Sequence, residues 1–203
     1  MNPPPREKLY TLPNFLTLLR IFFVPVIIGI SLAISGPADT FTNRLFSFLG
    51  GLAMLLSAIS DVLDGYLARK WKIVSRLGVL FDPMADKLVI LTALVMLIPL
   101  SRVPAWAVVL FLVRELAVTS LRGFAAADGI FIEATKLGKS KATLQSIALG
   151  LIFLYYPYFS VNWYRIGMVF LWLALAVTLL SGFDYFYQFF REESARRKGS
   201  GSN

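Results

Sequence analysis

Long apolar runs separated by short polar segments are the main feature of the sequence. A membrane-spanning helix needs about 20 predominantly apolar residues. Segments with turn-forming residues, such as "SGPAD", "IPLSRVP" and "YPYFSVN", lie between several runs. The pattern predicts an all-α polytopic integral membrane protein with six transmembrane helices. The six runs cover roughly residues 14–35, 45–68, 79–100, 103–125, 142–160 and 164–188.

The composition also indicates a membrane protein. The 203 residues are 57% hydrophobic and 16% charged, whereas soluble domains average about 45–50% apolar and about 25% charged residues. We interpret residues 1–190 as a single membrane domain and residues 191–203 as a basic tail. The final "GSGSN" is typical of a flexible linker or an expression scar. The polar, proline-rich start shows no cleavable signal peptide.

The distribution of basic residues predicts how the chain is oriented in the membrane. If both termini face the cytoplasm, fourteen of the twenty lysines and arginines fall in inner segments, three in outer loops and three inside spans. This asymmetry follows the positive-inside rule. We therefore expect both termini to be cytoplasmic. The net charge of +8 then fits a membrane surface and phosphorylated substrates rather than nucleic acid.

Four aspartates lie near the inner end of the second apolar run and the inner start of the third. Asp61 and Asp64 are spaced i, i+3, and Asp82 and Asp86 are spaced i, i+4, so each pair shares one helical face. We expect the two helices to turn these faces together. Four gathered carboxylates would repel one another unless divalent cations bound them. A single aspartate near a helix end more often faces water or pairs with arginine, but four at helical spacing favour a functional site.

The residue types limit which metals such a site could hold. The chain has no cysteine and no histidine, so its metal ligands must be oxygen atoms, which favours Mg²⁺, Mn²⁺ or Ca²⁺. We expect Mg²⁺ or Mn²⁺. Two metal ions about 3.5–4 Å apart commonly stabilise displacement at phosphorus. The aspartates therefore predict a two-metal site for phosphoryl transfer.

The segment "DVLDGYLARKWKIVSRLGVLFDPMAD" has the pattern D-x-x-D-G-x-x-A-R, eight residues, then G-x-x-x-D-x-x-x-D. In this respect the chain resembles the CDP-alcohol phosphotransferases in full. The resemblance implies that an alcohol attacks the phosphorus of a CDP-linked lipid and that CMP leaves. It also implies a homodimer. The expected location is the bacterial cytoplasmic (inner) membrane, and the positive-inside distribution predicts an active site that faces the cytoplasm.

The resemblance further assigns roles to the matching residues. It implies that Asp61, Asp64 and Asp82 hold the metals. Asp86 would be the catalytic base and would also contact metal. The CDP-diacylglycerol site would be lined by Asp61, Gly65, Ala68, Arg69 and Gly78.

Other segments bear on the acceptor alcohol. "LPNFLTLLRIFFVP", "RELAVTSLRGFAA" and "GKSKATLQSIAL" resemble the phosphatidylglycerophosphate synthases of this family, whose acceptor is glycerol 3-phosphate. Arg114 and Arg122 lie about 80° apart on one predicted helix, and Lys139 and Lys141 follow on the same side. This basic cluster fits an acceptor with its own phosphate. The alternatives are that Arg114 only pairs with Glu115 or with a buried carboxylate, and that both lysines are ordinary inner loop charges.

Three further observations complete the candidate site. Asn14, Thr17 and Arg20 in the first run either contact the nucleotide or make only local caps and pairs. Lys87 follows Asp86 but is expected to point away from the aspartate face. "LGKSK" resembles part of a P-loop, but that motif needs glycine where the chain has Glu133.

Alternative functions stay open at this point. One is the same reaction with inositol phosphate as acceptor, or with phosphatidylglycerol to give cardiolipin. A divalent-cation transporter could use the aspartates as an ion path, although no polar residues continue toward the outer side. A non-catalytic scaffold would have no need for the full signature. CMP release from CDP-diacylglycerol discriminates among these functions.

Overall fold

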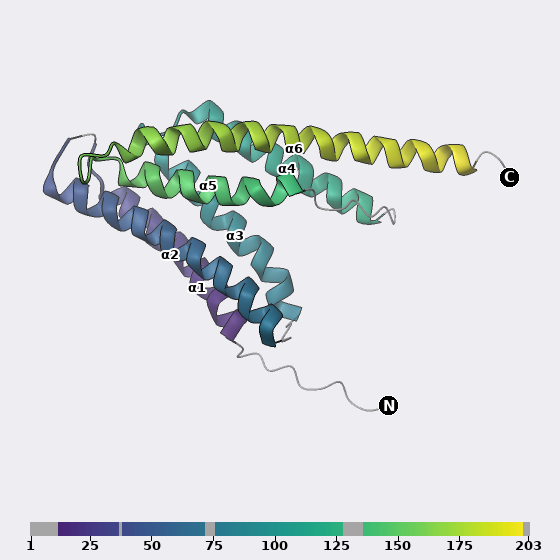
Figure 1. Ribbon diagram of the computed structural model, residues 1–203, viewed down its shortest axis with the longest axis horizontal. Coiled ribbons are helices and arrows are strands. Elements are labelled where there is room, and N and C mark those ends of the chain that lie inside the picture. Colours follow the sequence, from purple (N-terminus) through teal and green to yellow (C-terminus); the bar gives the residue numbers. More distant parts are fainter. Residues whose placement is uncertain (1–11, 37, 72–75, 128–135, 201–203) are drawn as a thin grey trace.

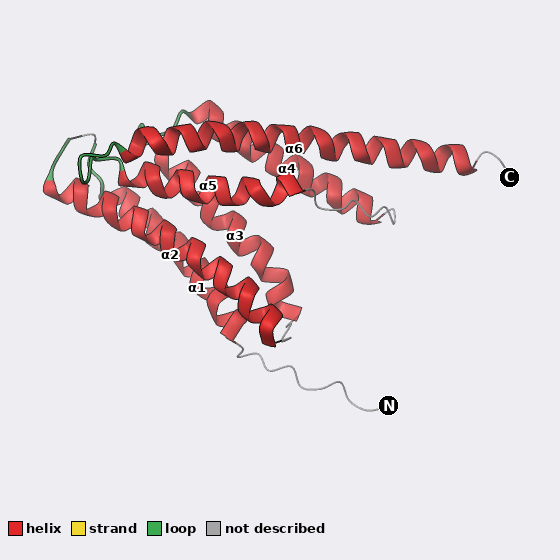
Figure 2. Cartoon of the chain, viewed as in Figure 1, coloured by secondary structure: helices red, strands yellow, loops and turns green. Residues whose placement is uncertain are grey.

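A computed structural model describes the backbone of residues 12–36, 38–71, 76–127 and 136–200 (Figure 1). Within these ranges the side chains of residues 12–17, 61–62, 64–71, 76–83, 126, 136–140 and 195–200 lie outside the description. The described ranges are all-helical, as predicted (Figure 2). The helices are α1 Leu12–Ala33, α2 Phe41–Trp71, α3 Arg76–Leu97, α4 Ala105–Ala127, α5 Lys136–Leu154 and α6 Trp163–Ser200.

Each predicted apolar run corresponds to one helix, but both ends of α5 and the end of α6 differ from the prediction by six residues or more. α5 begins at Lys136 rather than near residue 142. α5 ends at Leu154 rather than near residue 160. Tyr155 has a positive φ of 43°, and Tyr156 precedes a proline, which disfavours the helical conformation. α6 continues to Ser200 as one helix. It therefore crosses the boundary expected after residue 190 and includes the first two residues of "GSGSN".

The connections α1–α2, α3–α4 and α5–α6 meet at one end of the bundle (Figure 1). Tyr156 donates its hydroxyl to the Ala38 carbonyl at 2.8 Å, and Tyr158 donates to the Arg44 carbonyl at 2.8 Å. Arg44 in turn forms a two-point ion pair with Asp39. This pair holds the pKa of the exposed Asp39 carboxyl below its usual value, chiefly through the hydrogen bond from Arg44. The loop end of the bundle is thus tied together by side-chain bonds to backbone carbonyls.

Arg102, in the α3–α4 connection, joins α2 and α5 at this end. Its side chain is buried, with 2% exposed, and it donates to the Phe153 carbonyl at 2.9 Å and to Ser47 Oγ at 2.7 Å. The guanidinium carbon also lies 4.3 Å from the ring centre of Tyr155, a cation–π geometry. Burying a guanidinium costs free energy unless it is hydrogen-bonded, so the contacts with Phe153 and Ser47 offset that cost.

Replacing Arg102 with leucine should destabilise the bundle by about 2–4 kcal/mol, since charged hydrogen bonds and a cation–π contact are lost together. Thermal unfolding of the purified protein in detergent measures the effect. Arg165→Leu is the matched control, because Arg165 is exposed near the start of α6. Equal unfolding midpoints for the two variants would show that Arg102 does not stabilise this end.

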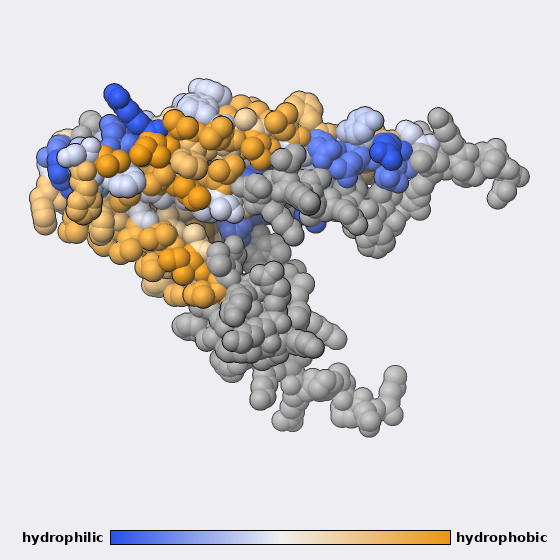
Figure 3. Space-filling view, viewed as in Figure 1, coloured by the Kyte–Doolittle hydropathy of each residue, from blue (hydrophilic) through white to orange (hydrophobic). Residues whose placement is uncertain are grey.

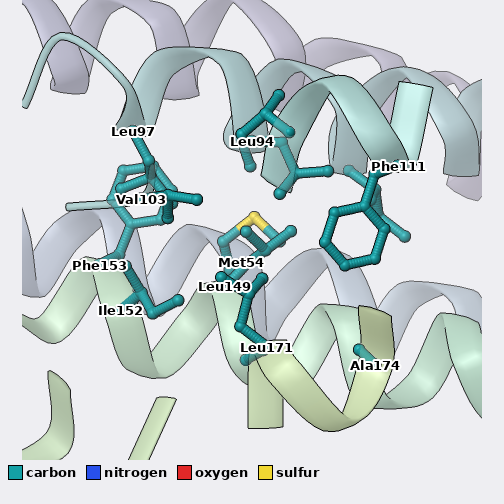
Figure 4. Close-up of a cluster of buried hydrophobic side chains, with 14 of the residues drawn as sticks. Met54, Leu94, Leu97, Val103, Phe111, Leu149, Ile152, Phe153, Leu171 and Ala174 are labelled. Carbon is teal, nitrogen blue, oxygen red and sulfur yellow. The ribbon is translucent and has the colours of Figure 1, made fainter. Parts of the chain in front are cut away.

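The core lies between the helices at the loop end and in the middle of the bundle. Met54 of α2 lies among Leu94, Phe111, Leu149 and Leu171, which come from four other helices (Figure 4). α1 packs against α2 and α3, α5 packs against α2 and α6, and α4 packs against α6. This packing fixes α3, α4, α5 and α6 around the site described below.

Close helix approach depends on glycine in α2. A Cβ atom at Gly50 would lie 2.5 Å from the Phe153 ring, and one at Gly51 would lie 2.8 Å from Leu154. Both distances are shorter than side chains tolerate, so only glycine allows α2 and α5 to come this close.

The described surface is widely apolar (Figure 3). Polar side chains gather at the loop end and along the C-terminal part of α6. In the described part of the chain, the segments Phe41–Ser60 and Trp163–Ser194 are long and apolar enough to cross a membrane. Side chains such as Leu32, Leu180 and Phe183 are exposed on the outside. Apolar surface of this extent indicates a membrane protein.

Candidate active site

The four aspartates of the signature lie at the other end of the bundle from the three loops. Asp61 and Asp64 belong to the C-terminal part of α2, while Asp82 and Asp86 belong to the N-terminal half of α3. Of these four, only Asp86 has a described side chain. The predicted clustering of the carboxylates therefore concerns side chains outside the description and stays a prediction.

A cavity of about 310 Å³ lies between α2, α3 and α5. Among the described residues, α1 packs against both α2 and α3, whereas α2 and α3 make little direct contact. The carboxylate-bearing helices therefore border a space large enough for a ligand. The lining consists of Met54, Ser57 and Ala58 from α2, Asp86, Val89 and Ile90 from α3, and Ala142, Thr143, Ser146 and Ile147 from α5.

A second cavity of about 210 Å³ lies among α3, α4, α5 and α6. Asp86, Ile90 and Ala142 line both cavities. Asp86 is thus the described carboxylate that borders both spaces. The second cavity, called the basic cavity below, is also lined by Lys87, Leu91, Phe111, Arg114, Glu115, Val118, Thr119, Arg122, Lys141, Gln145, Thr178 and Tyr185.

The structure brings three predicted acceptor-binding cations into the lining of the basic cavity. Arg114 and Arg122 come from α4 and Lys141 comes from α5. The predicted 80° separation of the two arginines therefore leaves both on the cavity face. Lys139 lies in the first turn of α5, and its side chain is outside the description. Lys141 is more than an inner loop charge, because it lines this cavity.

Glu115 is the centre of an ion-pair cluster in the cavity wall. Its carboxylate pairs with Lys87 Nζ and with an Arg114 nitrogen, each at 3.1 Å, and it accepts a hydrogen bond from Lys141 Nζ. Lys87 also donates to Thr119 Oγ1 at 2.8 Å. One carboxylate therefore holds three cations from three helices in fixed positions.

Arg114 is part of the wall of the cavity. Its Nε donates to the Thr178 carbonyl at 3.0 Å, and a terminal nitrogen donates to Ser181 Oγ at 2.8 Å. Only 7% of the side chain is exposed. A Cβ atom at Gly182 would lie 3.2 Å from Arg114 Cγ, so α6 is closely fitted to this arginine. Arg114 does pair with Glu115, but it does more than that, because it also lines the basic cavity and joins α4 to α6.

Arg122 differs from Arg114 in its contacts. Among the described residues, no hydrogen bond or ion pair joins Arg122 to another side chain. It is exposed, and it lines the cavity four residues after Val118 on α4. Arg122 is therefore the cation of this lining whose guanidinium is open to an anionic ligand.

Lys87, which the sequence predicts to point away from the aspartate face, lines the basic cavity beside Asp86 but does not line the cavity between α2 and α3. A turn of 100° between neighbours still leaves both side chains on a cavity that spans four helices. Lys87 faces α4, where Glu115 and Thr119 bind it.

The charges of the basic cavity favour a dianion. Its lining holds four cations, Lys87, Arg114, Arg122 and Lys141, and two carboxylates, Asp86 and Glu115. The formal net charge is +2, which matches a phosphate monoester near neutral pH. The ion pairs with Glu115 fix the shape of the cavity wall. The net positive charge of the lining attracts the phosphate.

The remaining predicted residues are placed by backbone only, apart from Arg20. Arg20 is buried in α1, with 2% exposed, which is unusual for a charged side chain in an apolar helix. Asn14 and Thr17 lie in α1. Gly65, Ala68 and Arg69 lie in α2 and Gly78 lies in α3, with their side-chain surroundings outside the description.

Comparison with known proteins identifies the family. The family model of the CDP-alcohol phosphatidyltransferases matches residues 10–180. The chain belongs to the CDP-alcohol phosphatidyltransferase family. It is 37% identical over 176 residues to a CDP-diacylglycerol–glycerol-3-phosphate 3-phosphatidyltransferase of Rickettsia felis, covering 86% of this chain and 93% of the relative.

Proteins of the same name from other bacteria are similar over comparable lengths. The Bacillus subtilis protein is 35% identical over 187 residues, with 88% of this chain and 94% of the relative covered. The Haemophilus influenzae protein is 31% identical over 187 residues, with 87% and 91% covered. This CDP-alcohol phosphatidyltransferase therefore aligns with whole relatives, so the predicted membership of the family is confirmed.

Sequence reasoning did not single out several residues of the basic cavity. Glu115 was considered only as a neighbour of Arg114, and Gln145 and Thr178 were not considered as site residues. For Gln145 a signal exists: it lies four residues after Lys141 on α5 and therefore on the same helical face. No comparable signal marks Thr178.

Proposed function

We propose that this family member transfers the phosphatidyl group of CDP-diacylglycerol to glycerol 3-phosphate, releasing CMP and giving phosphatidylglycerophosphate. The observation that supports it most is the basic cavity, with a formal charge of +2 and with Asp86 on its border. The names of the relatives point to the same two substrates. An acceptor without a phosphate would leave this positive charge uncompensated.

We propose that all six helices cross the cytoplasmic (inner) membrane of a bacterium. The positive-inside distribution supports cytoplasmic termini, and the three tied loops then lie outside (Figure 1). The aspartates and the basic cavity would face the cytoplasm, where CMP and glycerol 3-phosphate are soluble. A homodimer is proposed from the family resemblance alone.

The residues present fit a divalent-metal site. Asp61, Asp64, Asp82 and Asp86 supply only carboxylate oxygens, the ligand type that Mg²⁺ and Mn²⁺ prefer. Asp86 borders both cavities, so ligands from α2 and α3 could meet there. When bound, the metals would neutralise negative charge on the phosphates.

The side chains of the basic cavity have separate tasks in the proposed reaction. Arg122 and Lys141 bind the acceptor phosphate. Glu115 and Arg114 hold Lys141 and the wall of α6 in place. Asp86 accepts the proton of the attacking hydroxyl, since it borders both the cavity between α2 and α3 and the basic cavity.

The proposed function is tested by CMP release from CDP-diacylglycerol by the purified protein in detergent with Mg²⁺. We expect release with glycerol 3-phosphate and little with glycerol, inositol phosphate or phosphatidylglycerol. Faster release with one of these alternatives would reassign the acceptor. Metal flux into protein-containing liposomes, together with no CMP release, would instead support a transporter.

Replacing Arg122 with glutamine should raise the KM for glycerol 3-phosphate about tenfold or more, because a charge-assisted contact with the phosphate is lost. The KM for CDP-diacylglycerol should change little. Arg191→Gln removes the same charge from the exposed part of α6 and is the control. Equal losses for both substrates would remove Arg122 from the acceptor site.

A further inference from the structure

Gln145 is a buried polar residue without an assigned role. It lies on α5, lines the basic cavity and has 6% of its surface exposed. Within the described part of the chain, no hydrogen bond joins its amide to another residue. Buried amides are nearly always hydrogen-bonded, because an unpaired one costs free energy. The missing partner is therefore expected inside the cavity.

Thr178, on the neighbouring helix α6, is also a buried polar residue whose side chain has no hydrogen-bond partner among the described residues. It lies on α6 and lines the same cavity, with 1% exposed. Its hydroxyl oxygen is buried and has no hydrogen-bond partner among the described residues. Phe111, a member of the hydrophobic core, also lines the cavity. Thr178 is therefore a second buried polar residue of the cavity lining whose side chain has no partner among the described residues.

The position of Gln145 relative to Lys141 indicates what it binds. The two residues are one helical turn apart on α5, about 6 Å along the axis, and both line the basic cavity. A phosphate bound at Lys141 would leave the carbon chain of a small acceptor extending toward Gln145. An amide both donates and accepts hydrogen bonds, so it can bind a hydroxyl group in either direction.

We propose that Gln145, assisted by Thr178, binds the non-reacting C2 hydroxyl of the acceptor and so selects a polyol phosphate. The inference rests on the proposed function. The reacting hydroxyl must lie at Asp86, where the two cavities meet, and the phosphate at the cations. The C2 hydroxyl lies between these groups in glycerol 3-phosphate and needs its own partner in a buried site.

The test compares glycerol 3-phosphate with 3-hydroxypropyl phosphate, which lacks only the C2 hydroxyl. The wild type should favour glycerol 3-phosphate by about 10-fold or more in kcat/KM, since a buried hydroxyl-binding group left unpaired is penalised. Gln145→Met keeps the length of the side chain without its polar atoms. It should lower kcat/KM for glycerol 3-phosphate toward that for the analogue, while the analogue changes by less than about threefold.

Gln188→Met is the matched control, because Gln188 lies farther along α6 and donates to Asp184 at 3.0 Å. It should keep the wild-type preference. Thr178→Val should reduce the preference partially, since valine has the same shape without the hydroxyl. An equal fall for both acceptors in Gln145→Met would show a structural role and overturn the proposal.

The wild-type comparison needs no variant, so poor folding of Gln145→Met does not prevent the test. If the wild type uses both acceptors equally well, the hydroxyl subsite is refuted while the transferase function stands. If the wild type releases no CMP with either acceptor, the proposed function itself is refuted.

Discussion

Each of the single substitutions Asp61→Asn, Asp64→Asn and Asp82→Asn should abolish measurable CMP release. An amide keeps the shape of the side chain but removes the negative charge, and a divalent cation binds a neutral oxygen far less well than a carboxylate. If these residues hold the metals of the proposed site, the charge on the reacting phosphates is no longer balanced in such a variant. We expect losses of at least about 10³-fold, on the scale of removing a main electrostatic contribution to catalysis.

The measurement is initial rate against Mg²⁺ or Mn²⁺ concentration for each variant. Chelator should also stop the wild-type reaction, and added metal should restore it. Asp39→Asn is the control, because Asp39 is an exposed carboxylate at the loop end and pairs with Arg44. If one of the three variants keeps a near wild-type rate at limiting metal, the aspartate that it replaces is not a metal ligand.

The sequence was sufficient to predict the all-helical fold, since six apolar runs of spanning length leave little choice of secondary structure. The helix ends were harder to predict. α5 ends six residues before the end of its apolar run, where Tyr155 takes a positive φ and Pro157 follows. The composition of "YPYFSVN" marks a turn, but it does not say at which residue the helix stops.

The composition of the basic cavity could be predicted only in part. Arg114 and Arg122 were paired correctly, because helical periodicity relates residues on one helix. Contacts between helices are not encoded in this way. The bonds from Arg114 to Thr178 and Ser181, 64 and 67 residues away, and the clustering of Lys87 and Lys141 on Glu115 depend on how α3, α4, α5 and α6 pack.

These contacts change the roles of the cations. A sequence pattern treats all basic residues as equal candidates for binding phosphate. In the structure Arg114 is held by α6 and Glu115, whereas Arg122 has no such bond within the described ranges. Substrate binding is therefore expected to depend directly on Arg122, while Arg114 acts through the position of its neighbours.

Replacing Asp86 with asparagine should lower turnover by roughly 10²-fold or more, the usual effect of losing a general base. A primary alcohol is a weak nucleophile near neutral pH, so its proton must leave as the oxygen attacks phosphorus. The chain has no histidine to accept it. Lys87 borders the same cavity, but its amino group is already engaged by Glu115 and Thr119.

Asp86 is the described carboxylate with access to both cavities, so it can reach an acceptor hydroxyl that points at the donor lipid. The proton passes to its carboxylate while the hydroxyl oxygen bonds to the β-phosphorus and the bond to CMP breaks. We expect direct in-line transfer without a covalent phosphatidyl-enzyme. In Asp86→Asn, binding of CDP-diacylglycerol at saturating metal should largely survive while turnover falls. In the wild type, labelled CMP should not exchange into CDP-diacylglycerol unless acceptor is present. Exchange without acceptor, or a trapped phosphatidyl-enzyme, would show that a side chain attacks first. Asp86 would then have another role.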